Sequence, residues 1–551
     1  MRHMKSALLV LLLAASTAQA ALPKSGGSPA HDYILGRFAF ADDRLGDAAR
    51  YFDQARKLDP ADATLGRRAF ELAVAAGDQK LAFSLANQLA AAKQDDSNVA
   101  LVRLTDAVDR KDWKAVEVAR AGLAGAGYAV VVAPIVEAWS LYARGDTTAA
   151  LAKLNPDTVT GFTKSYLTEQ RAYMFAAVGR YAEASAIYHE LRVSTGNAFL
   201  RVGEADALQQ MGQAVQAAVV LESAPRNAVT TAASARLAAG KRIGGLADNP
   251  RDGLGWAFAR LSTDLAREKP VPLALMFARL ATFMAPDNAT TWMVTGDILA
   301  RGGRADAAIE AYSHIAASDP LADTARDRRA EVMAGNGQGD AARALLEAST
   351  KASGATADSW MRLGDYYRRA ENHAEAARAY GKAIALSPEG SASWTAYFLR
   401  GSAAEQAGDW AAAEPDLRRA LALAPEEAMV LNYLGYALLD RSLTPDTAQA
   451  LIAKASALQP DDGFITDSLG WALFRRGKFD EAVPVLERAV AAQPSDPTIN
   501  EHLGDAYWRT GRRIEARFRW RAATELEPTP KAKELLLAKL DYGLDVATAA
   551  R

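Results

Sequence analysis

Small and bulky apolar residues recur at nearly fixed intervals through the C-terminal half of the chain. Five glycines each lie 24 or 25 residues before a proline, and successive prolines of this set are 37, 35, 34 and 34 residues apart. This spacing predicts pairs of antiparallel helices, because glycine and alanine let two helices approach closely and proline ends the second helix. The residues of this pattern are the glycines Gly364, Gly401, Gly435, Gly470 and Gly504, the alanines Ala376, Ala413, Ala448, Ala482 and Ala516, the bulky residues Tyr380, Leu417, Leu486 and Trp520, and the prolines Pro388, Pro425, Pro460, Pro494 and Pro528.

The interval over residues 463–496 resembles the tetratricopeptide repeat (TPR) consensus, a 34-residue helix–turn–helix unit, at nearly every position. Residues 289–322 and 29–62 fit the same template, and weaker copies lie between them. A single helix pair cannot bury its apolar face, whereas stacked neighbours form a continuous core. We therefore expect an all-α TPR solenoid, wound as a right-handed superhelix. The residues of 463–496 that match the consensus are Leu469, Gly470, Leu473, Ala482, Leu486, Ala489 and Pro494.

The regularity of the repeats varies along the chain and predicts its organisation. Residues 21–225 read as an N-terminal array of degenerate repeats and residues 288–528 as a regular C-terminal array. Over 226–287 the pattern is lost, which indicates either an irregular helical joint or two long atypical helices that continue one superhelix. Residues 529–551 are expected to form a capping helix, over Lys531 to Leu544, and a tail.

The first twenty residues have the pattern of a signal peptide. Arg2 and Lys5 precede a short apolar stretch, and Ala18-Gln19-Ala20 fits the small-x-small cleavage pattern. We expect cleavage before Ala21 and a periplasmic protein, free or peripheral to the outer membrane; an uncleaved anchor is the alternative. No later segment has about eighteen uncharged apolar residues in a row, so no transmembrane segment is expected in the mature chain.

Composition narrows the classes of function. Half of the residues are hydrophobic and 24% are charged, enough to bury a large core, and the formal net charge is −2. That charge provides no field for gripping nucleic-acid phosphates, so no nucleic-acid partner is expected. The chain has no cysteine, which excludes disulfides, thiolate metal sites, cysteine nucleophiles and a lipidated cysteine.

No residue pattern indicates catalysis. The six histidines are scattered without metal-type spacing, and the chain has no HExxH, GxSxG or Walker motif. Paired carboxylates such as Asp461-Asp462 stand beside prolines in turns, where capping of helix N-termini is the commoner role. The sequence therefore predicts a protein that is not an enzyme and that has no cofactor or metal.

The first helix of each repeat lines the concave face of a TPR superhelix, through positions 2, 5, 9, 12 and 13 of the unit. Aromatic and arginine side chains there have the composition of protein-interface hot spots. The alternatives are that Trp471 and Trp508 fold into the core and that Asn432 and Arg475 are ordinary solvated residues. The predicted protein-binding groove comprises Asn432, Tyr436, Asp467, Trp471, Arg475, Glu501, Asp505, Trp508 and Arg509.

Five arginines form a second cluster, on the turn and the outer helix of the last regular repeat. Such a helix is usually a solvated face, and a patch for an acidic partner or lipid headgroups is the functional alternative. The cluster consists of Arg512, Arg513, Arg517, Arg519 and Arg521.

Two blocks in the last repeats resemble a proteobacterial family of envelope TPR proteins, the LbcA-like family. They run from Asp462 to Leu473, with the letters DSLGW at 467–471, and from Ile499 through Arg517. The resemblance covers about residues 285–530. It implies an adaptor for a periplasmic carboxy-terminal processing protease and its substrates. The family's adaptor is tethered by a lipidated cysteine, which this chain lacks, so a free periplasmic form or one held by another protein is implied.

Two functions follow as hypotheses. The first is a periplasmic scaffold or adaptor that holds extended or C-terminal polypeptide segments in its groove and presents substrates to an envelope protease. The second is a structural TPR subunit of an envelope assembly for polysaccharide export, secretion or outer-membrane biogenesis, in which the outer faces would matter more than the groove.

Overall fold

The computed structural model describes residues 27–223, 227–267, 272–351, 355–388, 390 and 392–549. Within those ranges the chain is all-helical and has no strand, which confirms the predicted all-α TPR solenoid. The chain divides into two compact units, unit 1 over residues 1–339 and unit 2 over residues 340–551. The expected signal peptide, residues 1–20, lies outside the described residues. No helix in the described part of the chain is both long and apolar enough to span a bilayer.

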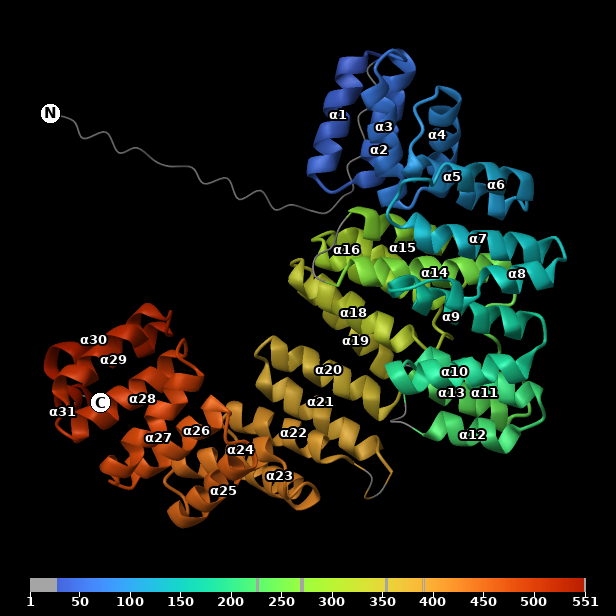
Figure 1. Ribbon diagram of the computed structural model, residues 1–551. Coiled ribbons are helices and arrows are strands. Elements are labelled where there is room, and N and C mark those ends of the chain that lie inside the picture. The colour runs from blue at the N-terminus through green and yellow to red at the C-terminus, as the bar shows by residue number, and fades with distance from the viewer. Residues whose placement is uncertain are drawn as a thin grey trace, which may run out of the picture. The chain divides into compact units, whose positions relative to one another are not determined.

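Unit 1 is a succession of short helices joined by turns and loops (Figure 1). Its helices are α1 (Pro29–Ala41), α2 (Leu45–Leu58), α3 (Ala63–Ala76), α4 (Gln79–Ala91), α5 (Ser97–Asp109), α6 (Trp113–Ala121), α7 (Ala129–Ala143), α8 (Thr147–Lys153), the 3₁₀ turn η1 (Pro156–Thr158), α9 (Phe162–Ala177), α10 (Tyr181–Thr195), α11 (Ala198–Gln210), α12 (Ala214–Glu222), α13 (Ala228–Ala238), α14 (Pro250–Leu265), α15 (Pro272–Met284), α16 (Ala289–Arg301), α17 (Ala305–Ser313) and α18 (Ala322–Gly335).

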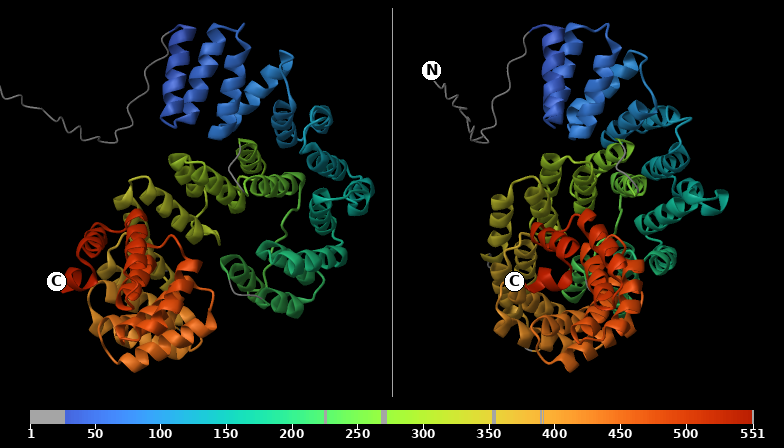
Figure 2. Two further views of the ribbon diagram at one scale, coloured as in Figure 1. Left: turned by 60° about the vertical axis from the view of Figure 1, so that its left-hand side comes forward. Right: turned by 90° about the vertical axis from the view of Figure 1, so that its left-hand side faces the viewer.

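The first twelve helices form six hairpins, and α14 and α15 fold back onto their inner side. Helix α14 packs on α5, α7 and α9, and α15 packs on α3 and α5, all of them first helices of their hairpins. One hydrophobic cluster runs from α1 through α11 and includes Phe258 of α14 and Phe277 of α15, both fully buried. Figure 2 shows α14–α16 on the inner side of the arc that leads from blue to green. Helices α14 and α15 thus occupy much of the concave face of unit 1.

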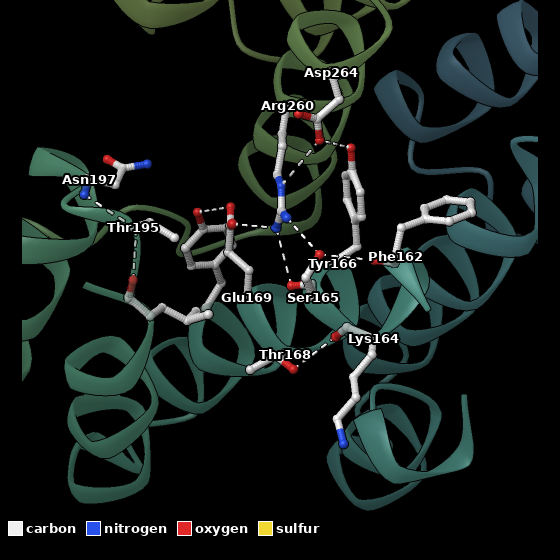
Figure 3. Close-up of polar contacts among 12 residues, drawn as sticks. Phe162, Lys164, Ser165, Tyr166, Thr168, Glu169, Thr195, Asn197, Arg260 and Asp264 are labelled. Atoms are coloured by element: carbon white, nitrogen blue, oxygen red, sulfur yellow. Dashed lines mark hydrogen bonds and ion pairs between the residues drawn. The ribbon is translucent and has the colours of Figure 1, made fainter. Parts of the chain in front are cut away.

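The interface between α9 and α14 includes a cluster of paired polar side chains (Figure 3). The guanidinium of Arg260 donates to the backbone and hydroxyl oxygens of Ser165, at 3.1 and 2.8 Å, and to Oε2 of Glu169 at 2.6 Å. The same guanidinium lies over the ring of Tyr166, whose hydroxyl donates to Asp264 at 2.5 Å. Because these groups satisfy one another, α14 is an integral part of unit 1.

A buried arginine anchors α15 in the same way. Arg279 is 4% exposed and its Nε donates to the backbone carbonyl of Ala75 at the end of α3, at 3.0 Å. Burial lowers the pKa of Arg279 to about 10, as expected for a cation taken out of water. The region 226–287, expected as a joint or as two long helices in one superhelix, consists of α13, α14 and α15 inside unit 1, and α14 and α15 line its inner side.

Unit 2 repeats one hairpin with greater regularity, and its helices follow a curved path (Figure 2). They are α19 (Gly339–Lys351), α20 (Ala357–Arg369), α21 (His373–Leu386), α22 (Trp394–Gln406), α23 (Trp410–Leu423), α24 (Ala428–Asp440), α25 (Pro445–Leu458), α26 (Gly463–Arg475), α27 (Phe479–Ala492), α28 (Pro497–Arg509), α29 (Arg513–Glu525), α30 (Pro530–Tyr542) and α31 (Leu544–Ala549).

The periodic glycines of unit 2 sit where the two helices of a hairpin touch. A Cβ atom at Gly470 would lie 2.6 Å from the side chain of Leu486, and one at Gly504 would lie 2.5 Å from the ring of Trp520. These separations are too short for real carbon contacts, so only glycine permits the observed packing. Aspartates cap the first helices as expected: Asp462 accepts from the backbone N–H groups of Phe464 and Ile465, at 2.8 and 3.0 Å.

Helices α30 and α31 cover the end of unit 2. Lys539 of α30 is 2% exposed, and its Nζ donates to Oε1 of Glu501 at 2.5 Å and to both oxygens of Asp505 at 2.8 and 2.9 Å. Asp505 also accepts from Nε1 of Trp520 at 2.9 Å. The last repeat therefore ends in a buried, fully paired ionic network, in place of a further hairpin.

Candidate protein-binding groove

The first helices of four successive hairpins in unit 2 enclose a pocket of about 450 Å³ on their shared face. We call this feature the groove pocket. Its walls come from α22, α24, α26 and α28, so four successive hairpins contribute side chains to one surface. The lining residues are Glu405, Asn432, Tyr433, Tyr436, Ala437, Asp440, Arg441, Phe464, Asp467, Ser468, Asp496, Thr498, Ile499 and His502. Three of the nine predicted site residues, Asn432, Tyr436 and Asp467, are among them.

Three polar side chains on α24 have no partner among the described residues. Oδ1 of Asn432 is buried and accepts no hydrogen bond. The hydroxyl of Tyr436 and the exposed carboxylate of Asp440 also have neither a hydrogen bond nor an ion pair there. Burial, together with the charges of Asp467 and Asp440, raises the pKa of Tyr436 to about 12, so its hydroxyl remains a donor at physiological pH. Buried polar groups are normally hydrogen-bonded, so this wall is able to accept new hydrogen bonds.

A buried pair links α26 to α28 at the back of the pocket. Nδ1 of His502 lies 2.9 Å from Oδ2 of Asp467, and the two residues are 7% and 6% exposed. The ring of Trp471 stacks on the imidazole at 3.9 Å between centroids and on Phe474 at 4.7 Å. Trp471 is thus half-buried between two rings. Burial lowers the pKa of His502, but the charge of Asp467 and its hydrogen bond outweigh this effect, so the net shift is upward.

The cause of the raised His502 pKa can be tested by titrating the imidazole. In the Asp467→Asn variant, burial would no longer be opposed by a carboxylate charge and hydrogen bond, and the imidazole pKa should fall. Two-dimensional NMR of the histidine ring protons would measure it. In the intact protein the pair stabilises unit 2 below the ordinary histidine pKa, and this contribution is lost as pH rises through the raised value. An unchanged His502 titration in the variant would contradict the pairing.

A second stacked pair in the chain offers an internal control for this titration. His314 stacks on Trp292 in the same geometry, at 3.9 Å between centroids and 11° between planes. It is exposed and has no carboxylate partner among the described residues. Its resonance should not change when Asp467 is replaced.

The other predicted site residues lie outside the groove pocket. Arg475 is exposed and its Nη2 donates to Oγ of Ser442 at 3.3 Å. Glu501 and Asp505 bind Lys539 of the covering helix α30. Trp508 donates to Asp545 of α31 at 3.1 Å, and the guanidinium of Arg509 pairs with the same carboxylate. The polar groups of the last repeat therefore face the covering helices α30 and α31.

The predicted set also omitted residues that the structure places in the pocket. Phe464 stands at position 2 of its repeat and Glu405 at position 12 of an earlier one, so the same rule applied to every repeat would have found both. Asp496 and Arg441 belong to the turns, where the rule does not reach. The side chain of Phe464 is 53% exposed, so its ring is available to contact a ligand.

Unit 1 has two larger pockets beside its first hairpins, of about 780 and 750 Å³, which share Phe40, Arg68 and Glu71. Their principal arginines are already engaged. Arg67 pairs with Asp96 at 2.8 Å, Arg68 lies over the ring of Phe40, and Arg304 pairs with Asp43. Size therefore favours unit 1, whereas free hydrogen-bonding capacity favours the groove pocket of unit 2. The groove pocket is the better candidate for a binding site, because specific recognition needs polar groups that are available to pair.

The groups that line the groove pocket are suited to binding a ligand. Among the residues that the structure describes, no cluster of three or more histidine, cysteine or acidic side chains could hold a metal ion. The groove pocket combines aromatic walls, unpaired acceptors and a hydroxyl donor, which are the elements of recognition of a polypeptide.

Comparison with known proteins agrees with the repeat assignment. Residues 277–323, 329–391, 398–463 and 468–536 match the tetratricopeptide repeat family model, so these parts of the chain are TPR repeats. A TPR repeat-containing protein of Pseudomonas aeruginosa is 35% identical over 85 residues, which span 15% of this chain and 14% of that relative's length.

Several solved structures are similar to this chain at low sequence identity. The APC/C hetero-tetramer Cut9–Hcn1 is 13% identical, with 93% of this chain and 96% of that chain covered and a TM-score of 0.37. Yeast Tom70 is 15% identical, with 95% and 96% covered and a TM-score of 0.36. MamA from AMB-1 is 23% identical, with 30% of this chain and 97% of that chain covered and a TM-score of 0.27.

Proposed function

We propose that the protein is an exported scaffold that holds partner polypeptides along the groove pocket of unit 2 and has no catalytic role. The observation that carries this proposal is the set of unpartnered polar groups on α24, at Asn432, Tyr436 and Asp440, within a pocket with aromatic walls. An extended polypeptide offers main-chain donors and acceptors at regular intervals, which suits several helix turns that face one surface. The TPR repeats support a protein-interaction role.

The finer role that we propose is that of a periplasmic adaptor which presents substrates to an envelope protease. It is supported by the signal-peptide pattern of residues 1–20 and by the resemblance of residues 462–473 and 499–517 to an envelope adaptor family. With no cysteine to carry a lipid, the protein would act free in the periplasm or be held at the outer membrane by another protein.

A structural role in an envelope assembly is the second candidate, and the outer face of α29 favours it. Ile514 and Phe518 are 72% and 67% exposed there, and Arg521 beside them has no partner among the described residues. The equivalent positions of the preceding repeat carry Asp480 and Pro484, so this apolar pair is particular to the last hairpin. Exposed apolar side chains with arginine are suited to a permanent contact.

A pull-down from envelope extract with the tagged protein separates the two candidates. Tyr436→Ala removes a groove-wall contact and should weaken recovery of a groove-bound partner by about thirtyfold, equivalent to a hot-spot loss of about 2 kcal/mol. Ile514→Ser with Phe518→Ser should leave that recovery unchanged. A protease recovered together with its substrate supports the adaptor. A stoichiometric membrane complex that only the α29 variant disrupts would overturn the adaptor and favour the structural role.

A further inference from the structure

The groove pocket is acidic, and its two basic side chains are already paired. Glu405, Asp440, Asp467 and Asp496 line it from α22, α24, α26 and the turn before α28. Nη2 of Arg441 donates to Oε1 of Glu405 at 2.6 Å. His502 pairs with Asp467, as described above. Asp440 and Asp496 therefore have no basic partner among the described residues, although Oδ1 of Asp496 caps the N-terminus of α28.

The pocket also offers uncommitted acceptors to a ligand. Oδ1 of Asn432 and the carboxylate of Asp440 accept no hydrogen bond in the described part of the chain. The Tyr436 hydroxyl and the Nδ2 amide group of Asn432 are uncommitted donors beside them in the described part of the chain. A ligand group that only donates would satisfy these acceptors, whereas a carboxylate or phosphate would be repelled. A guanidinium has five N–H donors in a planar fork and no acceptor.

The walls suit a planar cation. Tyr433, Tyr436 and Phe464 contribute three aromatic rings to the pocket, and the face of an aromatic ring attracts a cation. Guanidinium groups stack on such faces and pair with carboxylates in a fork, which an ammonium group does not do. The charge of Arg475 opposes the effect of the nearby carboxylates on the pKa of Tyr436. Arg475 is exposed, bonds to Ser442 and does not line the pocket.

The geometry points to an arginine side chain of the bound polypeptide as the occupant of the groove pocket. Its guanidinium lies against the ring of Tyr436 and pairs with Asp440, while a main-chain N–H of the ligand donates to Asn432, about 12 Å earlier along α24, as the ligand continues along the first helices. This inference rests on the proposed function and specifies its ligand. A volume of about 450 Å³ accommodates a long side chain with part of the adjoining main chain.

The test uses random twelve-residue peptides displayed on phage and selected on the purified protein. Selected sequences are synthesised with a fluorescent label, and their dissociation constants are measured by fluorescence polarisation. We expect the selected peptides to share one arginine. Its replacement by citrulline, which is neutral and of the same shape, should weaken binding about tenfold or more, as expected for loss of a charge-assisted hydrogen bond. Asp440→Asn should weaken the arginine peptide similarly and abolish the difference between arginine and citrulline.

Asp480 provides the matched control, because it is exposed on the outer side of α27 and has no partner among the described residues. Asp480→Asn should leave binding of both peptides unchanged. Peptides that lose binding in Tyr436→Ala but tolerate citrulline would overturn the arginine inference and leave the groove intact. Peptides that bind Tyr436→Ala as well as the unaltered protein, or a failure to select any peptide, would overturn both the inference and the proposed function.

Discussion

Gly253→Ala should destabilise unit 1 by about 3 kcal/mol or more, the upper range for overpacking a well-filled core. A Cβ atom at this position in α14 would lie 2.1 Å from Cε2 of Trp139 on α7. Trp139 is fully buried, and its Nε1 donates to Oε1 of Gln170 at 2.8 Å, so the ring cannot move aside without breaking that bond. The substitution therefore forces α14 away from the inner face of the hairpins.

Hydrogen exchange measured by mass spectrometry reports this effect separately for each unit. Peptides from α7, α9 and α14 should exchange about a hundredfold faster in the variant, and peptides from unit 2 should be unchanged. The control is Gly46→Ala on α2, where the nearest atom to the added Cβ lies 3.8 Å away, and no loss of protection is expected. Equal protection in Gly253→Ala and the unaltered protein would show that α14 does not occupy the inner face of unit 1.

Lys539→Met should destabilise the end of unit 2 by about 3–5 kcal/mol, the cost of leaving a buried charge without its partner. Glu501 and Asp505 would remain beside α30 with no cation, although the methionine fills a similar volume. Lys531→Met on the same helix removes an exposed lysine that has no partner among the described residues and should be nearly neutral. Urea unfolding followed by circular dichroism compares the two variants.

The loss in Lys539→Met should depend on pH in a defined direction. Burial raises the pKa of Asp505, and Lys539 opposes that shift. Without the lysine the pKa rises further, so the folded variant binds a proton that the unfolded chain does not, and its stability falls as pH increases. The destabilisation should be smaller at pH 5 than at pH 8. An equal loss at both pH values, or a full loss that persists when Asp505→Asn and Glu501→Gln are added, would contradict the buried ionic network.

The helical repeats of unit 2 could be predicted because each contact between helices requires a particular small residue. Gly470 and Gly504 leave no room for a side chain, and so they mark the repeat in the sequence. The insertion of α14 and α15 into unit 1 was not predicted, because it depends on contacts between segments as far apart as Ala75 and Arg279. A local signal did exist: residues 272–284 contain a single charged residue, Arg279, and a helix with no polar face is typical of a buried position. Residues 276–284 are indeed buried on every side.

The candidate site could be predicted in part for a related reason. The position rule finds Asn432, Tyr436 and Asp467, because identical repeats place equivalent residues on one surface. It does not anticipate that α30 and α31 take the place of a further hairpin and engage Glu501, Asp505, Trp508 and Arg509. Nor does it distinguish Asp467, which is committed to His502, from Asp440, which is not. Charge pairing between helices decides these roles, and it is not encoded in the spacing of one repeat.

The most direct test of the account is photo-crosslinking in living cells. The photoreactive residue p-benzoylphenylalanine replaces Tyr436 on the groove wall in one variant, Asp480 on the outer side of α27 in a second, and Ile514 on the outer face of α29 in a third. We expect a crosslinked polypeptide from position 436 and none from position 480. Crosslinks from position 514 alone, with none from position 436, would contradict the claim that unit 2 binds its partners through the groove pocket.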